Sequence, residues 1–404
     1  MKLIDTPLTV GGRTLRNRVV FQPMEGCDGT REGAPDELTE RRYLRFAEGG
    51  AGLIWFEATA VVSEGRANPR QMYLHEGTVG AFRALLDQVR EKAVGTCGFA
   101  PLIVAQLTHS GRFSKPDGVP APLVAYRNPL WEKGKEEQPY VVVNDEYCAS
   151  LPEKFARAAL LAEEAGFDGV DVKCCHGYLV NEFLSAKERP GKYGGSLENR
   201  TRLYFDCIDA AKEAVGDRLL VTTRLNGCDG FPYPYGFGVN EANEIDLAET
   251  KIILNELKNR GIELVDLTIG NPYLIPHVNR PWKFGPEDGS VSMKRIHDVT
   301  KELKAAAPEL KFVMSGLTYP GASALDEAND ALEAGAADLA GFGRMTFAYP
   351  AFYRDWRETG GLSPKKVCLA CGKCSELMRA GTVAGCPVRD SEVYLPYYKE
   401  YVNR

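Results

Sequence analysis

The sequence predicts a (β/α)₈ barrel, and three observations support this fold class. Eight short runs rich in Val, Leu and Ile recur along the 404 residues, as expected for parallel strands that are buried on both faces. Helical patterns separate these runs from one end of the chain to the other. The G-x-G-x-x-G signal of a doubly wound sheet does not follow the first strand, which disfavours that rival fold.

The expected strands and helices alternate in order along the chain. The strand runs cover residues 18–22, 52–58, 101–107, 169–173, 219–224, 264–269, 311–315 and 338–343. Helical patterns include residues 82–93, 151–165, 199–215, 248–260 and 323–334. Gly166, Gly261 and Gly335 each stand between a helix and the next strand, where a left-handed helix end is expected.

Three of the connections are longer than plain turns. They cover residues 114–150, 226–240 and 270–289, and each follows a strand on the barrel face where active sites lie. Long connections in a compact domain usually have a function, and these are rich in aromatic residues. They therefore indicate a pocket for a flat or apolar ligand, although aromatic residues that only keep the loops ordered would give the same pattern.

Composition excludes several classes of protein. There are 49 Lys and Arg against 55 Asp and Glu, a net charge of −6, so no basic surface for nucleic acid is expected. The apolar runs are far shorter than the roughly 20 residues that span a membrane. The first residues lack the apolar region of a secretory signal, so we expect a cytoplasmic protein whose scattered cysteines are reduced.

Four of the eleven cysteines form a cluster near the end of the chain. Cys368, Cys371, Cys374 and Cys386 have the spacing C-x2-C-x2-C-x11-C, and Pro387 follows the last one. Zinc sites usually pair their ligands as two C-x₂-C units, whereas three evenly spaced cysteines and a remote Cys-Pro are typical of iron–sulfur proteins. The spacing favours a [4Fe–4S] cluster, with a Zn(Cys)₄ site or free thiols as the alternatives.

Six motifs in order resemble the Old Yellow Enzyme flavoproteins, in the branch that includes trimethylamine dehydrogenase and bacterial 2,4-dienoyl-CoA reductase. The motifs are Asn17-Arg-Val-Val-Phe-Gln-Pro-Met24, Gln106-Leu-Thr-His-Ser-Gly-Arg112, His176-Gly-Tyr-Leu179 with Tyr193-Gly-Gly-Ser-Leu-Glu-Asn-Arg200, Arg224, Ser315-Gly316 and Gly343-Arg344. The resemblance covers residues 3 to about 390 and implies an FMN-dependent oxidoreductase of the NADH:flavin oxidoreductase type.

The residues at these positions suit an FMN site. Gln106 offers an amide to the pyrimidine edge of the flavin, and Arg224 offers a fixed positive charge near N1 and O2. The phosphate needs backbone N–H groups and a cation after strands seven and eight, where Ser315, Gly316, Gly343 and Arg344 stand. The resemblance also implies that Pro23, Met24 and Ala58 line the flavin through their backbones.

The candidate catalytic residues are Lys173, His176 and Tyr178. In ene-reductases of this family, two polar residues three apart bind the substrate carbonyl oxygen, and a Tyr two further on protonates Cα. This sequence has Lys173 at the first position, which departs from the usual His. Lysine can still stabilise an oxyanion, but it can also bind a carboxylate or titrate near neutrality when it is desolvated.

Glu25 is a second departure from the family pattern. Relatives often carry Thr or Cys there, near flavin O4 and N5, and in trimethylamine dehydrogenase a cysteine at that place is covalently attached to FMN. Because Glu stands there and Cys27 is two residues away, we expect non-covalent FMN. A carboxylate near N5 disfavours the reduced anionic flavin unless it is protonated, paired or turned away from the ring.

These features predict residues 1–362 as the FMN-binding barrel and residues 363–404 as the [4Fe–4S] segment. We expect an ene-reductase that adds hydride from flavin N5 and a proton from Tyr178 to a C=C bond conjugated to a carbonyl or carboxyl group. The alternatives are an amine dehydrogenase or demethylase, a non-catalytic electron carrier, and a zinc-stapled ligand-binding barrel.

We also expect particular partners. The nucleotide-binding domains of the longer relatives are absent from this sequence, so electrons are expected from NAD(P)H or from a separate ferredoxin, flavodoxin or reductase. We further expect a small-molecule substrate, a homo-oligomer, and no partner among nucleic acids or membranes.

Overall fold

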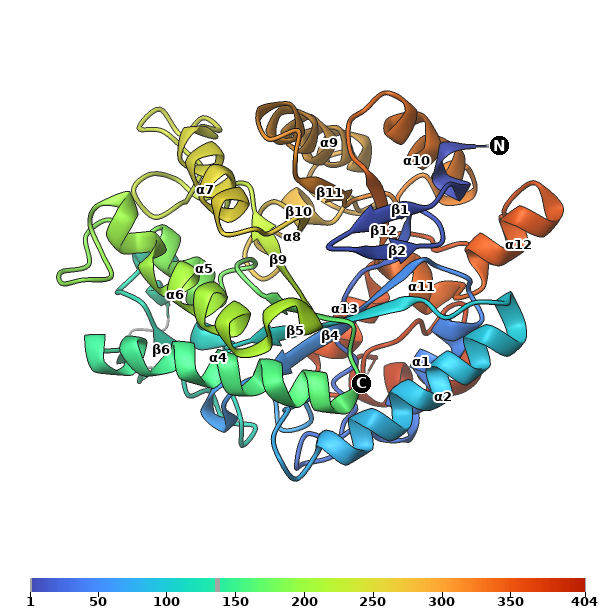
Figure 1. Cartoon of the computed structure of the whole chain (residues 1–404), viewed down its shortest axis with the longest axis horizontal. Coiled ribbons are helices and arrows are strands. Elements are labelled where there is room, and N and C mark those ends of the chain that lie inside the picture. The colour runs from blue at the N-terminus through green and yellow to red at the C-terminus, as the bar shows by residue number, and fades with distance from the viewer. Residues whose placement is uncertain (1, 135–138, 404) are drawn as a thin grey trace.

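The predicted barrel is present in the computed structural model, which describes residues 2–134 and 139–403. Eight strands form a closed ring in the order β10-β11-β12-β3-β4-β5-β8-β9, and neighbouring barrel strands are parallel (Figure 1). The barrel strands are β3 (Val19–Phe21), β4 (Leu53–Ala60), β5 (Leu102–Thr108), β8 (Gly169–Val172), β9 (Leu220–Asn226), β10 (Leu264–Thr268), β11 (Lys311–Met314) and β12 (Leu339–Phe342).

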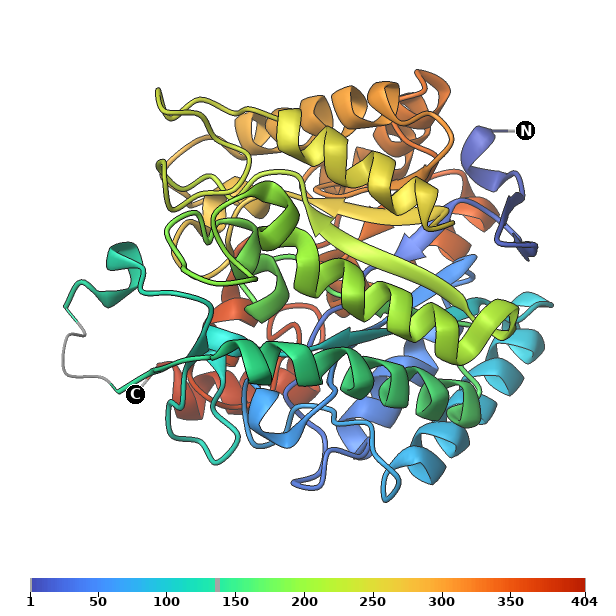
Figure 2. The ribbon, with the colours of Figure 1, turned by 60° about the vertical axis from the view of Figure 1, so that its left-hand side comes forward.

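Helices surround this ring. They are α1 (Glu37–Ala47), α2 (Val79–Cys97), α4 (Asp145–Ala165), α6 (Leu197–Val215), α7 (Ala248–Asn259), α9 (Gly289–Ala306), α10 (Ala324–Glu333) and α12 (Phe352–Thr359), with the shorter α3 (Pro129–Glu132), α5 (Leu179–Leu184), α8 (Pro276–Asn279) and α11 (Arg344–Ala348) in the connections. Helices α4 and α6 lie side by side along the outside of the barrel (Figures 1 and 2). Gly166, Gly261 and Gly335 adopt positive φ angles of 92°, 70° and 67°, which confirms the predicted left-handed helix ends.

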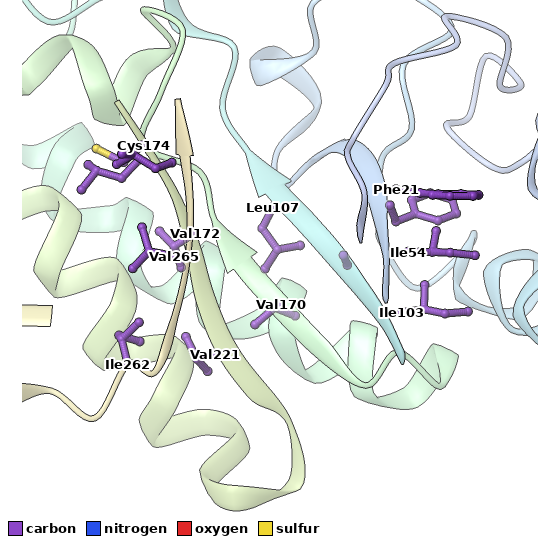
Figure 3. Packing of buried hydrophobic residues seen from close by; sticks show 14 of the residues in the cluster. Phe21, Ile54, Ile103, Leu107, Val170, Val172, Cys174, Val221, Ile262 and Val265 are labelled. Carbon is purple, nitrogen blue, oxygen red and sulfur yellow. The ribbon is translucent and has the colours of Figure 1, made fainter. Parts of the chain in front are cut away.

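Alternation along the strands separates two apolar layers. Val19 and Phe21 face the helices, whereas Val20 between them faces the barrel interior. Figure 3 shows the outer layer, in which Val170, Val172 and other strand residues pack among the helices. The two faces are therefore both apolar, which is why the strands read as continuous hydrophobic runs in the sequence.

A short hairpin closes the N-terminal end of the barrel. Strands β1 (Leu8–Val10) and β2 (Arg13–Leu15) pair antiparallel, and their buried residues Val10 and Leu15 belong to the interior apolar cluster with Val20 and Trp55. The interior is thus filled from below, and the open end lies at the opposite, C-terminal ends of the strands.

The cysteine-rich segment packs against the barrel rather than extending from it. It contains α13 (Lys373–Arg379) and α14 (Ser391–Tyr401), whose buried side chains Leu377, Tyr394 and Tyr398 form a small apolar cluster of their own. Asp390, at the start of α14, accepts hydrogen bonds from both terminal nitrogens of Arg41 on α1, at 2.7 and 2.8 Å, and pairs also with Arg45. These contacts fix the segment on the barrel.

The longest connection differs from the sequence expectation. Residues 114–150 were expected to form one long connection, but helix α4 begins at Asp145 and the connection contains α3 and the short strands β6 (Leu123–Val124) and β7 (Val141–Val142). Asn144 caps α4 by accepting a hydrogen bond from the Tyr147 backbone, which starts the helix six residues before the predicted 151. The part of this connection that carries α3 reaches out from the barrel (Figure 2).

None of the helices in the described part of the chain is both long and apolar enough to cross a membrane.

Candidate active site

One pocket opens at the C-terminal ends of the barrel strands and encloses about 1040 Å³, including its mouth. Every residue predicted to bind the cofactor or to act in catalysis lines it, namely Pro23, Met24, Glu25, Ala58, Gln106, Lys173, His176, Tyr178, Arg224, Ser315, Gly316, Gly343 and Arg344. The structure therefore brings together residues that are up to about 320 positions apart in sequence, because parallel strands in a barrel end on one face.

The floor of the pocket is a polar layer above the apolar interior. Asp171 on β8 accepts hydrogen bonds from Gln106 Nε2 at 2.7 Å, from Trp55 Nε1 at 2.8 Å and from the Arg224 backbone at 2.7 Å. These bonds orient Gln106, so that its carbonyl oxygen and one N–H remain for a ligand. Burial raises the pKa of Asp171 to about 7, although its hydrogen-bond donors oppose this shift.

A second buried hydrogen-bond network holds Arg224, the cation in the floor of the pocket. Arg224 Nε lies 3.0 Å from Asp266 Oδ2, and the other carboxylate oxygen accepts a hydrogen bond from Gln22 Nε2 at 2.7 Å. Gln22 also donates to Ser315 Oγ at 2.7 Å. Arg224 is therefore an ion-pair partner and also a pocket residue, so its charge is held in place for a ligand that stacks above the floor.

The turn between β8 and α5 directs His176 into the pocket. His176 and Gly177 both have left-handed backbone conformations, with φ angles of 67° and 73°. Asn271 Nδ2 donates to the His176 carbonyl at 2.9 Å, and the Gly177 N–H donates to Asn181 Oδ1 at 2.7 Å. A histidine in the left-handed backbone conformation is strained, and strained residues cluster at functional sites.

The His176 side chain is neutral, and one of its ring nitrogens is free to bind a ligand. Its Nε2 is buried and has no hydrogen-bond partner among the described residues. Burial and the charges of Arg224, Lys173 and Arg280 lower the pKa of His176 well below its ordinary value. A neutral imidazole at this point can hydrogen-bond an oxygen of a bound molecule.

Tyr178 stands at the centre of a group of polar side chains. Its hydroxyl is 3.0 Å from the Tyr273 hydroxyl and 3.5 Å from Glu25 Oε2. The ammonium of Lys173 lies 3.4 Å from the centre of the Tyr178 ring, and the Lys173 side chain does not reach solvent, since the residue is only 4% exposed. Burial lowers the pKa of Lys173 and raises that of Tyr178 well above its ordinary value.

Glu25 faces the pocket and not the protein exterior. Oε1 accepts a hydrogen bond from Asn68 Nδ2 at 2.9 Å, and the Cys27 thiol lies 3.8 Å from the same oxygen. Burial raises the pKa of Glu25, which favours the uncharged carboxyl group. The raised pKa of Glu25 reduces the conflict between a carboxylate and a reduced flavin that the sequence raised.

The end of the pocket at β11 and β12 suits a phosphate. Gly316 has a φ of 86°, and the N-terminus of α11 begins at Arg344 directly after Gly343. A Cβ at Gly343 would lie 3.0 Å from Met24 Sδ, so glycine leaves the room that this approach needs. Backbone N–H groups and the Arg344 guanidinium are the donors that a phosphate group requires.

The four clustered cysteines line a smaller cavity beside the main pocket, together with Arg344 and Arg389. The Ala370 backbone N–H points at Cys368 Sγ at 3.4 Å, and the Arg389 backbone N–H points at Cys386 Sγ at 3.3 Å. Such N–H···S contacts are typical of thiolates that hold a metal cluster. Burial raises the pKa of Cys368 to about 12, so the free thiol is protonated.

The cavity is not a closed metal site in this conformation. In residues 2–134 and 139–403, no three His, Cys, Asp or Glu side chains stand close enough together to hold one metal ion. The chemistry of the donor set, four thiols and no oxygen or nitrogen ligand, nevertheless suits an iron–sulfur cluster or zinc. Cys374 and its neighbour Ser375 also line the main pocket, so the two sites adjoin.

Several family-like motif residues support the site without lining it. His109 donates or accepts a 2.7 Å bond with the Tyr147 hydroxyl, Arg112 donates to Glu182 at 2.6 Å, and Asn17 Oδ1 accepts from the Gly52 backbone at 2.8 Å. These residues hold connections and strand ends in place. The motifs therefore include residues that support the pocket as well as residues that line it.

The sequence analysis did not predict some of the residues that line the pocket. Gln22 lies inside a quoted motif, and Tyr273 belongs to one of the aromatic connections, so a signal existed for both. Arg280 lines the pocket as well, and nothing in the sequence distinguishes it from surface arginines.

A family model for the NADH:flavin oxidoreductase / NADH oxidase family matches residues 4–359. An NADPH dehydrogenase from Geobacillus sp. (strain WCH70) is 32% identical over 274 residues, 66% of this chain and 73% of that protein. A probable flavin mononucleotide-dependent alkene reductase from Leishmania infantum is 29% identical over 367 residues, 85% of this chain and 87% of that protein.

Solved structures agree with this fold. The Old Yellow Enzyme from Pichia sp. AKU4542 has a TM-score of 0.68 at 25% identity, and the match covers 90% of this chain and 89% of that one. A 2-naphthoyl-CoA reductase has a TM-score of 0.77 at 20% identity over 96% of this chain, and this chain spans only 56% of that protein.

The barrel, the polar floor and the glycine- and arginine-lined end of the pocket define a flavin-dependent oxidoreductase of the β/α-barrel class. The chain belongs to the NADH:flavin oxidoreductase / NADH oxidase family, the Old Yellow Enzyme family that its motifs resemble.

Proposed function

We propose that this protein is an FMN-dependent ene-reductase that reduces a C=C bond conjugated to a carbonyl or carboxyl group. The observation that carries the proposal is the arrangement of Tyr178, His176 and Lys173, which face one pocket beside the predicted flavin-binding residues. The names of two relatives, an NADPH dehydrogenase and a probable FMN-dependent alkene reductase, support both the reaction and NADPH as the electron donor.

The residues that would hold FMN fit the group. Gln106 and Arg224 form a floor for the pyrimidine edge, and Pro23, Met24, Glu25 and Ala58 form the adjoining wall. Ser315, Gly316, Gly343 and Arg344 surround the phosphate end. When bound and reduced, FMN supplies a hydride to the substrate.

The substrate oxygen is held by His176 and Lys173. The unpartnered Nε2 of a neutral His176 donates when its other ring nitrogen is unprotonated, and the Lys173 ammonium adds a positive charge where enolate charge develops. Both groups stabilise an oxyanion more than a neutral carbonyl, so they lower the barrier rather than only bind substrate.

Tyr178 delivers the proton. Its hydroxyl proton passes to Cα while Cβ gains the hydride, so the C=C bond gains two electrons and two hydrogens and becomes a single bond. The tyrosinate that remains recovers its proton from Tyr273 at 3.0 Å or from the protonated Glu25 at 3.5 Å. The raised pKa of Glu25 favours its protonated form, which can supply that proton.

We further propose residues 363–404 as a [4Fe–4S]-binding segment beside the barrel of residues 1–362. Cys368, Cys371, Cys374 and Cys386 line one cavity, and two of their sulfur atoms already accept backbone N–H groups. The cluster would pass single electrons to or from a ferredoxin, flavodoxin or separate reductase, in addition to or in place of NADPH.

An anaerobic half-reaction experiment tests the function. The enzyme is reduced with NADPH and mixed with a panel of enones, unsaturated acids and methylated amines, while the flavin absorbance is followed. We expect an activated alkene to reoxidise the flavin and to appear as one equivalent of saturated product. If no alkene reoxidises the flavin, the ene-reductase proposal is wrong.

The same experiment distinguishes the main alternative, an amine dehydrogenase. The lowered pKa of Lys173 favours this alternative, because it favours the neutral amine, which is a base and a weaker oxyanion donor than the ammonium. An amine dehydrogenase would instead show bleaching of the oxidised flavin by a methylated amine in the absence of NADPH.

A further inference from the structure

Arg280 is a partly buried cation for which neither the motifs nor the family assignment provides a role. It follows helix α8 in the connection between β10 and α9, and it lines the same pocket as Gly316 and Arg344. Its guanidinium donates to Ser375 Oγ at 2.7 Å. No carboxylate within the described ranges of the chain pairs with it.

A second guanidinium lines the same pocket and contacts the residue that follows Arg280. Arg344, the first residue of α11, donates to the carbonyl of Pro281 at 2.7 Å, and Pro281 is the residue that follows Arg280. Burial, together with the neighbouring charges of Arg344 and Arg379, lowers the pKa of Arg280 to about 10. Two neighbouring guanidinium groups at a partly buried place repel each other, and an anion between them offsets that repulsion.

The other charges of the pocket already have counterparts. Arg224 pairs with Asp266 at 3.0 Å, and the Lys173 ammonium lies 3.4 Å from the centre of the Tyr178 ring. This leaves Arg280 and Arg344 as two positive charges at the end of the pocket that suits a phosphate. A phosphate monoester carries between −1.5 and −2 charges at neutral pH, which matches two guanidinium groups and exceeds what a single carboxylate offers.

We propose that Arg280 and Arg344 together form a two-arginine clamp for the phosphate monoester of FMN. Arg344 belongs to the strand end that the motif identifies, whereas Arg280 reaches the phosphate from the β10–α9 connection. Through Ser375, the same guanidinium links the phosphate site to α13 in the cysteine segment. The inference rests on the FMN site proposed above and adds a residue to it.

Comparing FMN with riboflavin isolates the phosphate contribution, because riboflavin lacks only that group. The full chain is freed of flavin and titrated with each compound, and binding is followed by the quenching of flavin fluorescence. In Arg280→Gln we expect the Kd of FMN to rise roughly 10- to 100-fold, as for the loss of a charge-assisted hydrogen bond. The Kd of riboflavin should stay within about twofold of the wild-type value.

Arg379→Gln is the matched control. Arg379 is also an arginine near this site and donates to the Pro272 carbonyl at 2.8 Å, but it does not line the pocket. It should leave both dissociation constants unchanged. Arg280→Lys keeps the charge and loses the forked geometry, so its Kd for FMN should lie between those of the wild type and Arg280→Gln.

Each other outcome has a definite meaning. Equal losses for FMN and riboflavin in both Arg280 variants would show that Arg280 only supports the connection, and the clamp would be wrong. Unchanged FMN binding, with or without a raised KM for an acidic substrate, would also overturn the clamp. A wild-type protein that binds neither flavin would instead overturn the proposed function itself.

Discussion

Tyr178 illustrates what a sequence can and cannot predict about a single residue. Its place after His176 and its type indicated a proton donor, and the structure puts its hydroxyl in the pocket. The partners of that hydroxyl, Tyr273 and Glu25, come from positions 95 and 153 residues away. Such distant contacts depend on how the connections fold over the barrel mouth, so the local pattern did not reveal them.

At the same scale, Asp171 gives the folded protein a pH dependence that can be measured. Its pKa is raised to about 7 by burial, whereas an unfolded chain has the ordinary value of about 4. Between these values the folded state holds a proton that the unfolded state has released, so stability falls as pH rises. The loss is at most about 1.4 kcal/mol per pH unit.

In flavin-free protein, Asp171→Asn should remove the part of the pH dependence of stability that comes from this carboxyl group. The substitution also disturbs three hydrogen bonds, which lowers stability by an amount that does not depend on pH. The free energy of unfolding of each protein is measured by urea unfolding at each pH. We expect the advantage of the wild type over the variant to decrease from pH 4 to 7 and then to stay constant. A difference that is the same at all pH values would contradict the raised pKa.

Among the elements, the β8–α5 turn depends most strongly on its backbone. Gly177 has a φ of 73°, and a Cβ there would lie 2.5 Å from Asn271 Nδ2, the atom that holds the His176 carbonyl. Gly177→Ala should therefore cost more than the roughly 1–2 kcal/mol of a left-handed alanine alone. Because the clash displaces His176, turnover should fall as well.

Gly195→Ala provides the control for this turn. Gly195 has a similar φ of 81°, but nothing lies within 4 Å of the position a Cβ would take. Thermal unfolding should show the smaller loss at Gly195, with turnover unaffected. If Gly177→Ala in an Asn271→Ala background still costs more than Gly195→Ala, the contact with Asn271 is not the cause.

Element boundaries show where the sequence patterns lose precision. The barrel strands were found because both of their faces are apolar, and alternation then placed Val20 inward and Val19 outward. The start of α4 was missed because Asn144 and Asp145 extend the helix into a stretch that otherwise resembles a loop. A polar cap is a local signal that a hydrophobic pattern does not contain.

On the scale of the whole molecule, the cysteine segment and the barrel form one continuous structure. Asp390 bonds to Arg41 and Arg45 of α1, and the Ala384 backbone donates to the Gly26 carbonyl at 2.6 Å, one residue after Glu25. The spacing of the cysteines indicated candidate ligands, but nothing in the spacing indicated that Cys374 and Ser375 border the main pocket.

The anaerobically purified protein should contain about four iron and four sulfide per chain, as a [4Fe–4S] cluster requires. Cys371→Ser removes one ligand and should lose iron and the visible absorbance of the cluster. Cys97→Ser should keep both, because Cys97 does not line that cavity and lies instead beside the backbone of Ala47 and Glu48. Stoichiometric zinc without sulfide would contradict the cluster.

The most direct test of the central claim is a stopped-flow comparison of Tyr178→Phe with the wild type, in separate half-reactions. Reduction of the flavin by NADPH should be unchanged, since that step needs no proton from Tyr178. Reoxidation by a confirmed alkene substrate should slow by about 10²- to 10⁴-fold, the usual contribution of a positioned proton donor. Reoxidation at the wild-type rate would show that the proton comes from another group and would contradict the account.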